Sequence, residues 1–200
     1  MLDSLPHWIR LGDTFASLRP VRQDDGTALE AMLLRQSPQS RYFRFHSAVN
    51  GLTRQALARM TRIADAQQLA LVLVTESPDG PRLIAEARFA SDDGVSAEIA
   101  LMVDEAWHRQ GLGRRALAAL TDAAVDAGMQ SLHGRVLQDN TSMLALARQA
   151  GWAVTRAADD GRVMRVRLDL TARPQYGVNG PASPRAAAGH APNRAAPCAR

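Results

Sequence analysis

The chain has 200 residues, of which 46% are apolar, so it is long enough to form one domain with a buried core. All 24 of its basic residues are arginine, and they exceed the 20 acidic residues to give a formal net charge of +4. Four arginines lie in residues 171–200, which hold no acid, so residues 1–170 are neutral overall. A neutral body with 4% aromatic residues argues against a nucleic-acid-binding surface.

Targeting signals and metal ligands are scarce in this sequence. The single cysteine, Cys198, excludes a disulfide framework and a cysteine metal site, and His46 and His133 have no second ligand at metal spacing. The N-terminus has no apolar signal-peptide core, and no apolar run approaches the roughly 18 residues of a membrane helix. We therefore expect a cytoplasmic protein, monomer or homodimer, that uses no metal and binds no nucleic acid and no membrane.

The first half of the chain predicts a strand followed by two helices. Residues 1–13 form a lead-in of uncertain structure, and an alternating stretch follows them. An aspartate pair can cap the first helix, Ser37-Pro38 should end it, and Thr53 can cap the second helix. The expected elements are a strand over Thr14–Arg19 and helices over Thr27–Gln36 and Arg54–Ala64.

The second half of the chain predicts strands separated by glycine-containing turns, with two more helices. Gly128 and Gly151 follow these helices as C-caps, and residues 171–200, rich in Ala, Pro, Gly and Arg, predict a disordered tail. Together the elements predict a mixed α+β domain over residues 14–170, with helices on the faces of a sheet. The expected strands are Leu69–Thr75, Leu83–Phe89, Ser96–Val103, Ser131–Leu137, Trp152–Arg156 and Val163–Leu170, and the helices are Leu112–Ala127 and Ser142–Gln149.

The segment His108–Arg115 joins one of these strands to an Ala/Leu-rich helix through Gly-x-Gly. A strand that enters a helix in this way exposes backbone N–H groups, which form a site for a phosphate anion. Arg114 and Arg115 fall in the first helical turn, where the helix dipole disfavours each by about 0.3–1 kcal/mol, so a bound polyanion would explain them. The alternative is a plain tight turn. The segment lacks the lysine of a nucleoside-triphosphate loop, and Ala116 replaces the third glycine of a dinucleotide loop.

The run His-Arg-Gln-Gly-Leu-Gly-Arg-Arg from His108 resembles the loop of the GCN5-related N-acetyltransferase (GNAT) superfamily. Further matches are Asn140 after the next strand, the helix that follows it, and Gly151-Trp152 where that family usually has Gly-Phe. The resemblance covers roughly residues 14–170. It implies a mixed, mostly antiparallel sheet of about six to seven strands with helices on both faces.

The same resemblance implies a site for acetyl-CoA as co-substrate. The backbone around Met102 and Val103 would pair with the pantetheine arm, and Asn140 would hold that arm from the other side. The first position of the loop motif departs from the family, because His108 stands there in place of Gln or Arg. The residues whose amides would cradle the pyrophosphate are His108, Arg109, Gln110, Gly111, Leu112, Gly113 and Arg114.

A carboxylate in the middle of one strand is the candidate general base. A lysine acceptor has a pKa near 10.4, so freeing its lone pair at neutral pH costs about 4.6 kcal/mol, and a positioned base is useful. Glu98 lies between apolar neighbours, which we expect to raise its pKa by desolvation, and its strand leads into the glycine loop. The alternative is a structural carboxylate that pairs with an arginine across the sheet, such as Arg88.

A finer resemblance favours the catalytic interpretation. The segment Ser37–Phe45, the pair Leu52-Thr53 and the stretch Ser96–Ile99 resemble the Pat-type protein lysine acetyltransferase branch, in which a glutamate at the Glu98 position is the base. Glu86 is the second choice. The tyrosine that protonates the leaving thiolate in many members is replaced by Ala147, as is common in the Pat-type branch.

The resemblance implies an acyltransferase that moves an acetyl group from acetyl-CoA to a primary amine by direct attack. The resemblance implies that the acceptor is a protein lysine. Two alternatives stay open from the sequence. One is an acetyltransferase for a small-molecule amine, and the other is a catalytically inactive CoA-binding regulatory module.

Overall fold

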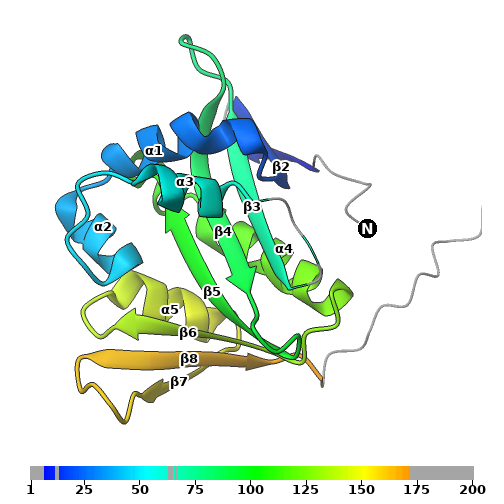
Figure 1. Cartoon of the computed structure of the whole chain (residues 1–200), viewed down its shortest axis with the longest axis vertical. Helices are drawn as coiled ribbons and strands as arrows, with labels where there is room; N and C mark the ends of the chain where they lie inside the picture. The colour runs from blue at the N-terminus through cyan, green and yellow to red at the C-terminus, as the bar shows by residue number, and fades with distance from the viewer. Residues whose placement is uncertain (1–6, 12–13, 63–64, 66, 172–200) are drawn as a thin grey trace, which may run out of the picture.

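The computed structural model describes residues 7–11, 14–62, 65 and 67–171. Their strands form one eight-stranded sheet in the order β1-β2-β3-β4-β5-β6-β8-β7 (Figure 1). Every neighbouring pair is antiparallel except β5 and β6, which are parallel. The strands are β1 (His7–Leu11), β2 (Thr14–Pro20), β3 (Gln68–Thr75), β4 (Arg82–Ala90), β5 (Ser96–Val103), β6 (Ser131–Leu137), β7 (Ala153–Arg156) and β8 (Val163–Asp169).

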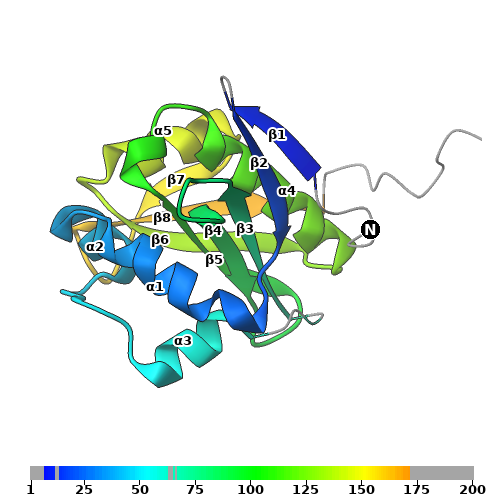
Figure 2. The ribbon, with the colours of Figure 1, turned by 90° about the horizontal axis from the view of Figure 1, so that it is seen from above.

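Helices cover both faces of this sheet. Figure 2 shows α1, α2 and α3 on one face and α4 and α5 on the other. The mixed α+β fold predicted from the sequence is therefore confirmed, with eight strands in place of six or seven. The helices are α1 (Gly26–Leu34), α2 (Pro38–Phe45), α3 (Arg54–Met60), α4 (Leu112–Asp126) and α5 (Thr141–Gln149).

Two apolar layers hold the helices to the sheet. α4 buries a stripe at helical spacing, including Leu117 and Leu120, against strands that also contact Leu144 of α5. On the other face, α1 buries Leu29 and Met32 in a second cluster with side chains of β3, β4 and β5. Because side chains alternate along a strand, neighbouring residues of β5 belong to different layers, and this decides which residues face the candidate site.

The additional strand is β1, which lies in the expected lead-in. β1 pairs with β2 and turns Ile9 and Leu11 into the α4 layer, while Trp8 remains 66% exposed. Two inward apolar residues are too few to establish a strand period in the sequence. The segment is a strand because it pairs with β2, a contact that the local pattern does not reveal. The sheet therefore begins earlier than residue 14.

The second difference is α2, which was not expected as a helix. Ser37-Pro38 ends α1 and also begins α2, because the Ser37 side chain accepts a hydrogen bond from Ser40 N and proline fits the first helical position. The helix ends at His46, which has a left-handed φ of 53°. The predicted tail beyond Thr171 and the last residues of the predicted helix 54–64 lie outside the described residues.

In the part of the chain that the structure describes, no helix combines the length and apolarity needed to cross a bilayer.

Candidate active site

The parallel pair β5–β6 separates soon after it forms. The register joins Ser96–Glu98 to Ser131–His133, whereas β5 continues to Val103 and β6 to Leu137. Within the described residues, the β6-facing edge of β5 therefore has no strand partner beyond Glu98. An open strand edge inside a covered sheet is suited to a ligand that pairs with the backbone like an added strand.

Beyond Glu98, β5 and β6 no longer pair, and we call the space between them the opening. The register of β4 and β5 shows which backbone groups of β5 face this opening. Asp104 N donates to Ile84 O at 2.8 Å, so alternate residues from Asp104 back along β5 form the hydrogen-bonded pairs with β4. Met102 is one of them, and its backbone points to Glu86. The predicted pantetheine contact at Met102 is therefore revised, because Leu101 and Val103 are the residues whose N–H and C=O groups face the opening.

The glycine loop lies at the wide end of the opening. Gly111 has a φ of 79° and forms the N-cap of α4 without a side-chain hydrogen bond, so the first amides of this 15-residue helix remain available to an anion. Arg109 also adopts a positive φ, 60°, a conformation that costs a non-glycine residue about 1–3 kcal/mol. Arg114 and Arg115 are exposed beside these amides. The geometry suits a phosphate.

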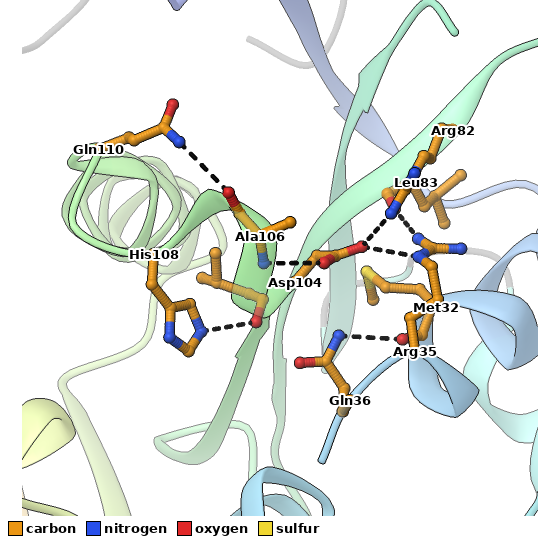
Figure 3. Close-up of polar contacts among 10 residues, drawn as sticks. Met32, Arg35, Gln36, Arg82, Leu83, Asp104, Ala106, His108 and Gln110 are labelled. Atoms are coloured by element: carbon orange, nitrogen blue, oxygen red, sulfur yellow. Dashed lines mark hydrogen bonds and ion pairs between the residues drawn. The ribbon is translucent and has the colours of Figure 1, made fainter. Parts of the chain in front are cut away.

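Two side chains of the loop bind backbone carbonyls (Figure 3). His108 Nε2 lies 2.9 Å from Val103 O, and Gln110 Nε2 donates to Ala106 O at 3.4 Å. Val103 O is a carbonyl that faces the opening, so the imidazole holds one of its two lone pairs and leaves the other for a ligand N–H. His108 thus acts here through the strand end rather than through the phosphate site.

Gly113 has a packing role in addition to its place in the loop. A Cβ at this position would lie 3.3 Å from Leu146 Cδ2 and 3.7 Å from Leu101 Cδ2. The glycine therefore lets α4 approach β5 and α5 closely, and any side chain there would disturb that packing. A test of the phosphate site consequently belongs at an exposed loop residue.

Asn140 and Ala147 lie on the far side of the opening, at α5. Asn140 Oδ1 accepts from Met143 N at 3.1 Å and caps α5, so a contact with pantetheine would come from the Nδ2 group. Ala147 is fully buried in the α4 layer. The position where many family members carry a tyrosine therefore holds only a methyl group inside the core.

Glu98 lies at the point where β5 and β6 separate. It is opposite Ala90 of β4 and His133 of β6, and its side chain is exposed on the face that carries α1, α2 and α3. Its apolar neighbours Ala97 and Ile99 point to the other face. The expected desolvation of Glu98 is therefore wrong, because flanking residues of a strand face away from its side chain.

Glu86, the second candidate for the general base, is held in buried ion pairs. It is fully buried and forms ion pairs with Arg88 and with Arg44 of α2, the latter at 3.3 Å. Burial raises the pKa of Glu86, but the two guanidinium groups outweigh burial and hold the pKa below its usual value. Arg88 thus pairs with Glu86 and not with Glu98. A carboxylate held ionised by two cations is a weak base, which disfavours the second choice.

A cluster that the sequence did not predict ties α1 and α2 to the end of β5. Asp104 is 2% exposed and accepts from Arg35 Nε at 2.7 Å and from Arg82 at 3.2 Å (Figure 3). Glu105 accepts from both the backbone N–H and the hydroxyl of Ser37, and these hydrogen bonds lower its pKa. The partners are 68 or more positions apart in sequence, except for Arg82, so local pattern gave no signal of the cluster.

Comparison with known proteins agrees with this geometry. A family model described as an acetyltransferase (GNAT) domain matches residues 17–153. The chain belongs to the GNAT acetyltransferase family. Membership places it among the acyltransferases. In the described residues no group of three or more His, Cys, Asp or Glu side chains could hold a metal ion.

Pat-type proteins are among the GNAT relatives most similar to this chain. The chain is 33% identical over 162 residues to acetyltransferase Pat of Mycolicibacterium smegmatis. The matched region covers 80% of this chain and 47% of that protein. The chain thus spans about half the length of this relative. The crystal structure of the GNAT domain of S. lividans PAT has a TM-score of 0.74 at 25% identity, covering 82% of this chain and 96% of that domain.

A structure described as an acetyltransferase with its cofactor acetyl-CoA shares the fold. YncA of Salmonella typhimurium, solved with its cofactor acetyl-CoA, has a TM-score of 0.60 at 21% identity, and the match covers 80% of this chain and 96% of that one. At this identity the likeness shows the fold alone.

Proposed function

We propose that this chain is an N-acetyltransferase that transfers the acetyl group of acetyl-CoA to a primary amine, with a protein lysine as acceptor and Glu98 as general base. The observation that carries the proposal is the opening between β5 and β6, which begins at Glu98 and widens toward the free amides of α4. A donor that lies in this opening would bring its thioester to the carboxylate and its phosphates to the helix.

The donor-side residues fit acetyl-CoA. Pantetheine contains two amide groups, and Leu101 and Val103 present backbone N–H and C=O groups that can pair with them. The first turn of α4 supplies amides for the pyrophosphate, and Arg114 supplies an opposite charge. Asn140 can donate from Nδ2 on the other side. His108 N already donates to Glu105 O at 3.2 Å, so the proposed amide cradle is confined to residues 109–114.

A lysine ammonium loses two protons in this reaction, one that frees its lone pair before attack and one that leaves the nitrogen as the amide forms. Acetyl-CoA supplies an activated acetyl thioester. As the amine nitrogen bonds to the carbonyl carbon and the C–S bond breaks, Glu98 takes the amine proton, directly or through one water. Backbone N–H groups on the open edge of β5 polarise the carbonyl. The departing thiolate, with a pKa near 8.5, is protonated by solvent, since Ala147 offers no acid.

The protein-lysine acceptor is supported by the likeness to Pat-type proteins. It is also supported by the exposure of Glu98 on the sheet face, because a base at the surface can serve a side chain presented by another protein. A small-molecule amine remains the alternative acceptor, and a CoA-binding module without catalysis is the second alternative.

The test is transfer of labelled acetyl groups from acetyl-CoA into a cell lysate, separated by size. Wild type is expected to label macromolecules, and Glu98→Gln is expected to lose at least about a hundredfold in rate while it still binds CoA. Label confined to small molecules would favour the alternative acceptor. Equal rates for wild type and Glu98→Gln would remove Glu98 from its role, and CoA binding without any transfer would indicate a binding module.

A further inference from the structure

The part of the sheet formed by β6, β8 and β7 has an exposed face beside the candidate site. Val136, Val166 and Leu168 turn into the α4 layer, so the residues between them point to the face that carries α1, α2 and α3. On that face α2 covers one end of these strands, where Phe43 packs against a cluster that includes Leu137. In Figure 1 the three strands lie at the bottom of the view, below the three helices.

Three arginine side chains gather on this face. Arg135 of β6 is opposite Arg165 of β8, and Arg167 follows two positions further along β8, so all three point the same way. All three are exposed, and we call them the arginine strip. Because residues 1–170 are neutral overall, the strip is a local concentration of charge and does not follow from the composition.

The arginine strip lies beside the candidate general base. Glu98 of β5 is opposite His133 of β6, and His133 is opposite Arg167 of β8, so these residues form one row across three strands. Neighbouring strands lie about 4.8 Å apart, which places the backbones of Arg167 and Glu98 about 10 Å from each other. Between them, His133 Nδ1 lies 3.1 Å from the Ser96 hydroxyl, so the imidazole already has a partner.

The charge of the arginine strip is only partly compensated within the protein. Arg135 pairs with Asp159 at 2.9 Å, whereas Arg165 and Arg167 form no ion pair with any residue that the structure describes. Like charges directly opposite each other on antiparallel strands destabilise the pair, and this applies to Arg135 and Arg165. An anionic ligand would remove this repulsion.

Two aspartates near the arginine strip are held by other groups. The hydrogen bond from Arg135 lowers the pKa of Asp159, and the charge of Arg165 adds to this effect. The pKa of Asp169 is lowered first by the hydrogen bond from the Thr171 hydroxyl and only last by the charge of Arg167. Both carboxylates therefore act on the free arginines through space and not as direct partners.

We infer that the arginine strip binds acidic side chains of the acceptor protein and so selects lysines that have a glutamate or aspartate nearby. This inference rests on the proposed function. Guanidinium groups bind carboxylates through paired, charge-assisted hydrogen bonds. The separation of about 10 Å between Arg167 and Glu98 corresponds to about three residues of extended chain, so the acid is expected about two to four positions from the lysine.

Other anions fit the arginine strip less well. The opening begins at Glu98 and widens toward α4, so the phosphates of CoA would lie at the opposite end from the strip. A nucleic acid would bring its phosphates close to the carboxylates of Glu98 and Asp159, which repel them. An acceptor lysine instead carries a positive charge to Glu98 while a neighbouring acid reaches the arginines.

The experiment measures the binding of two peptides to protein saturated with CoA, so that no turnover occurs. Both peptides have a central lysine, and the positions two and four residues away on either side hold glutamate in one peptide and glutamine in the other. Wild type is expected to bind the glutamate peptide about fivefold or more tightly at low salt, as measured by calorimetry. Raising the ionic strength to about 0.3 M should reduce this preference.

The double variant Arg165→Gln with Arg167→Gln is expected to reduce the preference to less than about twofold. Its melting temperature should not fall, because the change removes exposed like charges. The matched control is Arg148→Gln with Arg156→Gln, which removes two exposed arginines of α5 and β7 and should keep the preference. Arg156 shares the face of Val154, which packs in the α4 layer, so neither control residue belongs to the arginine strip.

The inference is overturned if wild type shows no preference, if the double variant keeps it, or if the control loses it equally. A single-stranded oligonucleotide that binds more tightly than the glutamate peptide, through the same two arginines, would also overturn it. Acetyl transfer to the two peptides judges the proposed function separately. If wild type prefers the glutamate peptide yet acetylates neither, the proposed function fails while the docking surface stands. Equal binding and equal acetylation of both peptides would have the opposite meaning.

Discussion

Two glutamates on adjacent strands of one face have opposite environments. Glu98 is exposed at the point where β5 and β6 separate, and Glu86 is fully buried between Arg44 and Arg88. The sequence predicts that both glutamates lie in apolar strands, and it could only rank Glu98 above Glu86 as the candidate general base. Their surroundings are decided by which residues of α2 and β4 reach them, and Arg44 is 42 positions away from Glu86.

The environment of Glu86 predicts how stability depends on pH. Because the folded-state pKa of Glu86 is below its unfolded value, its contribution is complete above the unfolded pKa and is lost as the pH falls through the folded pKa. Glu86→Gln is expected to lower the free energy of unfolding at neutral pH by about 3 kcal/mol, since it leaves two cations without their carboxylate. The loss of stability as the pH falls below the unfolded pKa of the glutamate should then be shallower than in wild type.

Urea denaturation across this pH range measures the effect. Asp159→Asn is the matched control, because Asp159 forms an exposed ion pair with Arg135, and little change is expected there. A Glu86→Gln variant as stable as wild type at neutral pH would show that the buried ion pairs do not stabilise the fold.

At the scale of elements, the join between β5 and α4 is the part of the site that the sequence predicted best. Both element boundaries lie within a residue of the prediction, because β5 is a continuous apolar run and α4 begins at Gly111 with a clear helical period. By contrast, the sequence did not predict which backbone groups of β5 pair with β4. Met102 pairs with Glu86 of β4, so the backbone groups of Leu101 and Val103 face away from β4, and this alternation depends on the pairing with β4.

The N-terminus of α4 gives a prediction in which stability and binding change in opposite directions. Arg114→Glu places a negative charge in the first turn, which the helix dipole favours by about 0.3–1 kcal/mol, so the free protein should be at least as stable as wild type. The same change repels the phosphates, and the affinity for CoA is expected to fall by about tenfold or more.

Calorimetric titration with CoA and thermal denaturation without ligand measure these two effects. Arg156→Glu, an equal charge change on exposed β7, should leave CoA affinity near that of wild type. If Arg114→Glu binds CoA normally, the phosphate site does not lie at this helix.

At the scale of the whole molecule, the composition has a direct consequence for the proposed reaction. None of the 24 basic residues is lysine, so no side chain of this chain offers the amine that the proposed reaction requires. Incubation with labelled acetyl-CoA is expected to leave internal peptides of the chain unlabelled, as measured by mass spectrometry after proteolysis. Label on a side chain would mean that another nucleophile, such as a hydroxyl or thiol, can accept the acetyl group.

The sequence by itself determined the order of all elements except β1 and α2, together with the α+β class, the glycine loop and the family. These depend on local period, turn residues and short motifs, which are properties of neighbouring positions. Only the tertiary structure decided that β5 and β6 separate after Glu98, that Glu98 is exposed while Glu86 is buried, and that the arginine strip lies beside Glu98. Each of these depends on contacts between segments far apart in the chain, and the register and layering that create such contacts are set by packing rather than by local pattern.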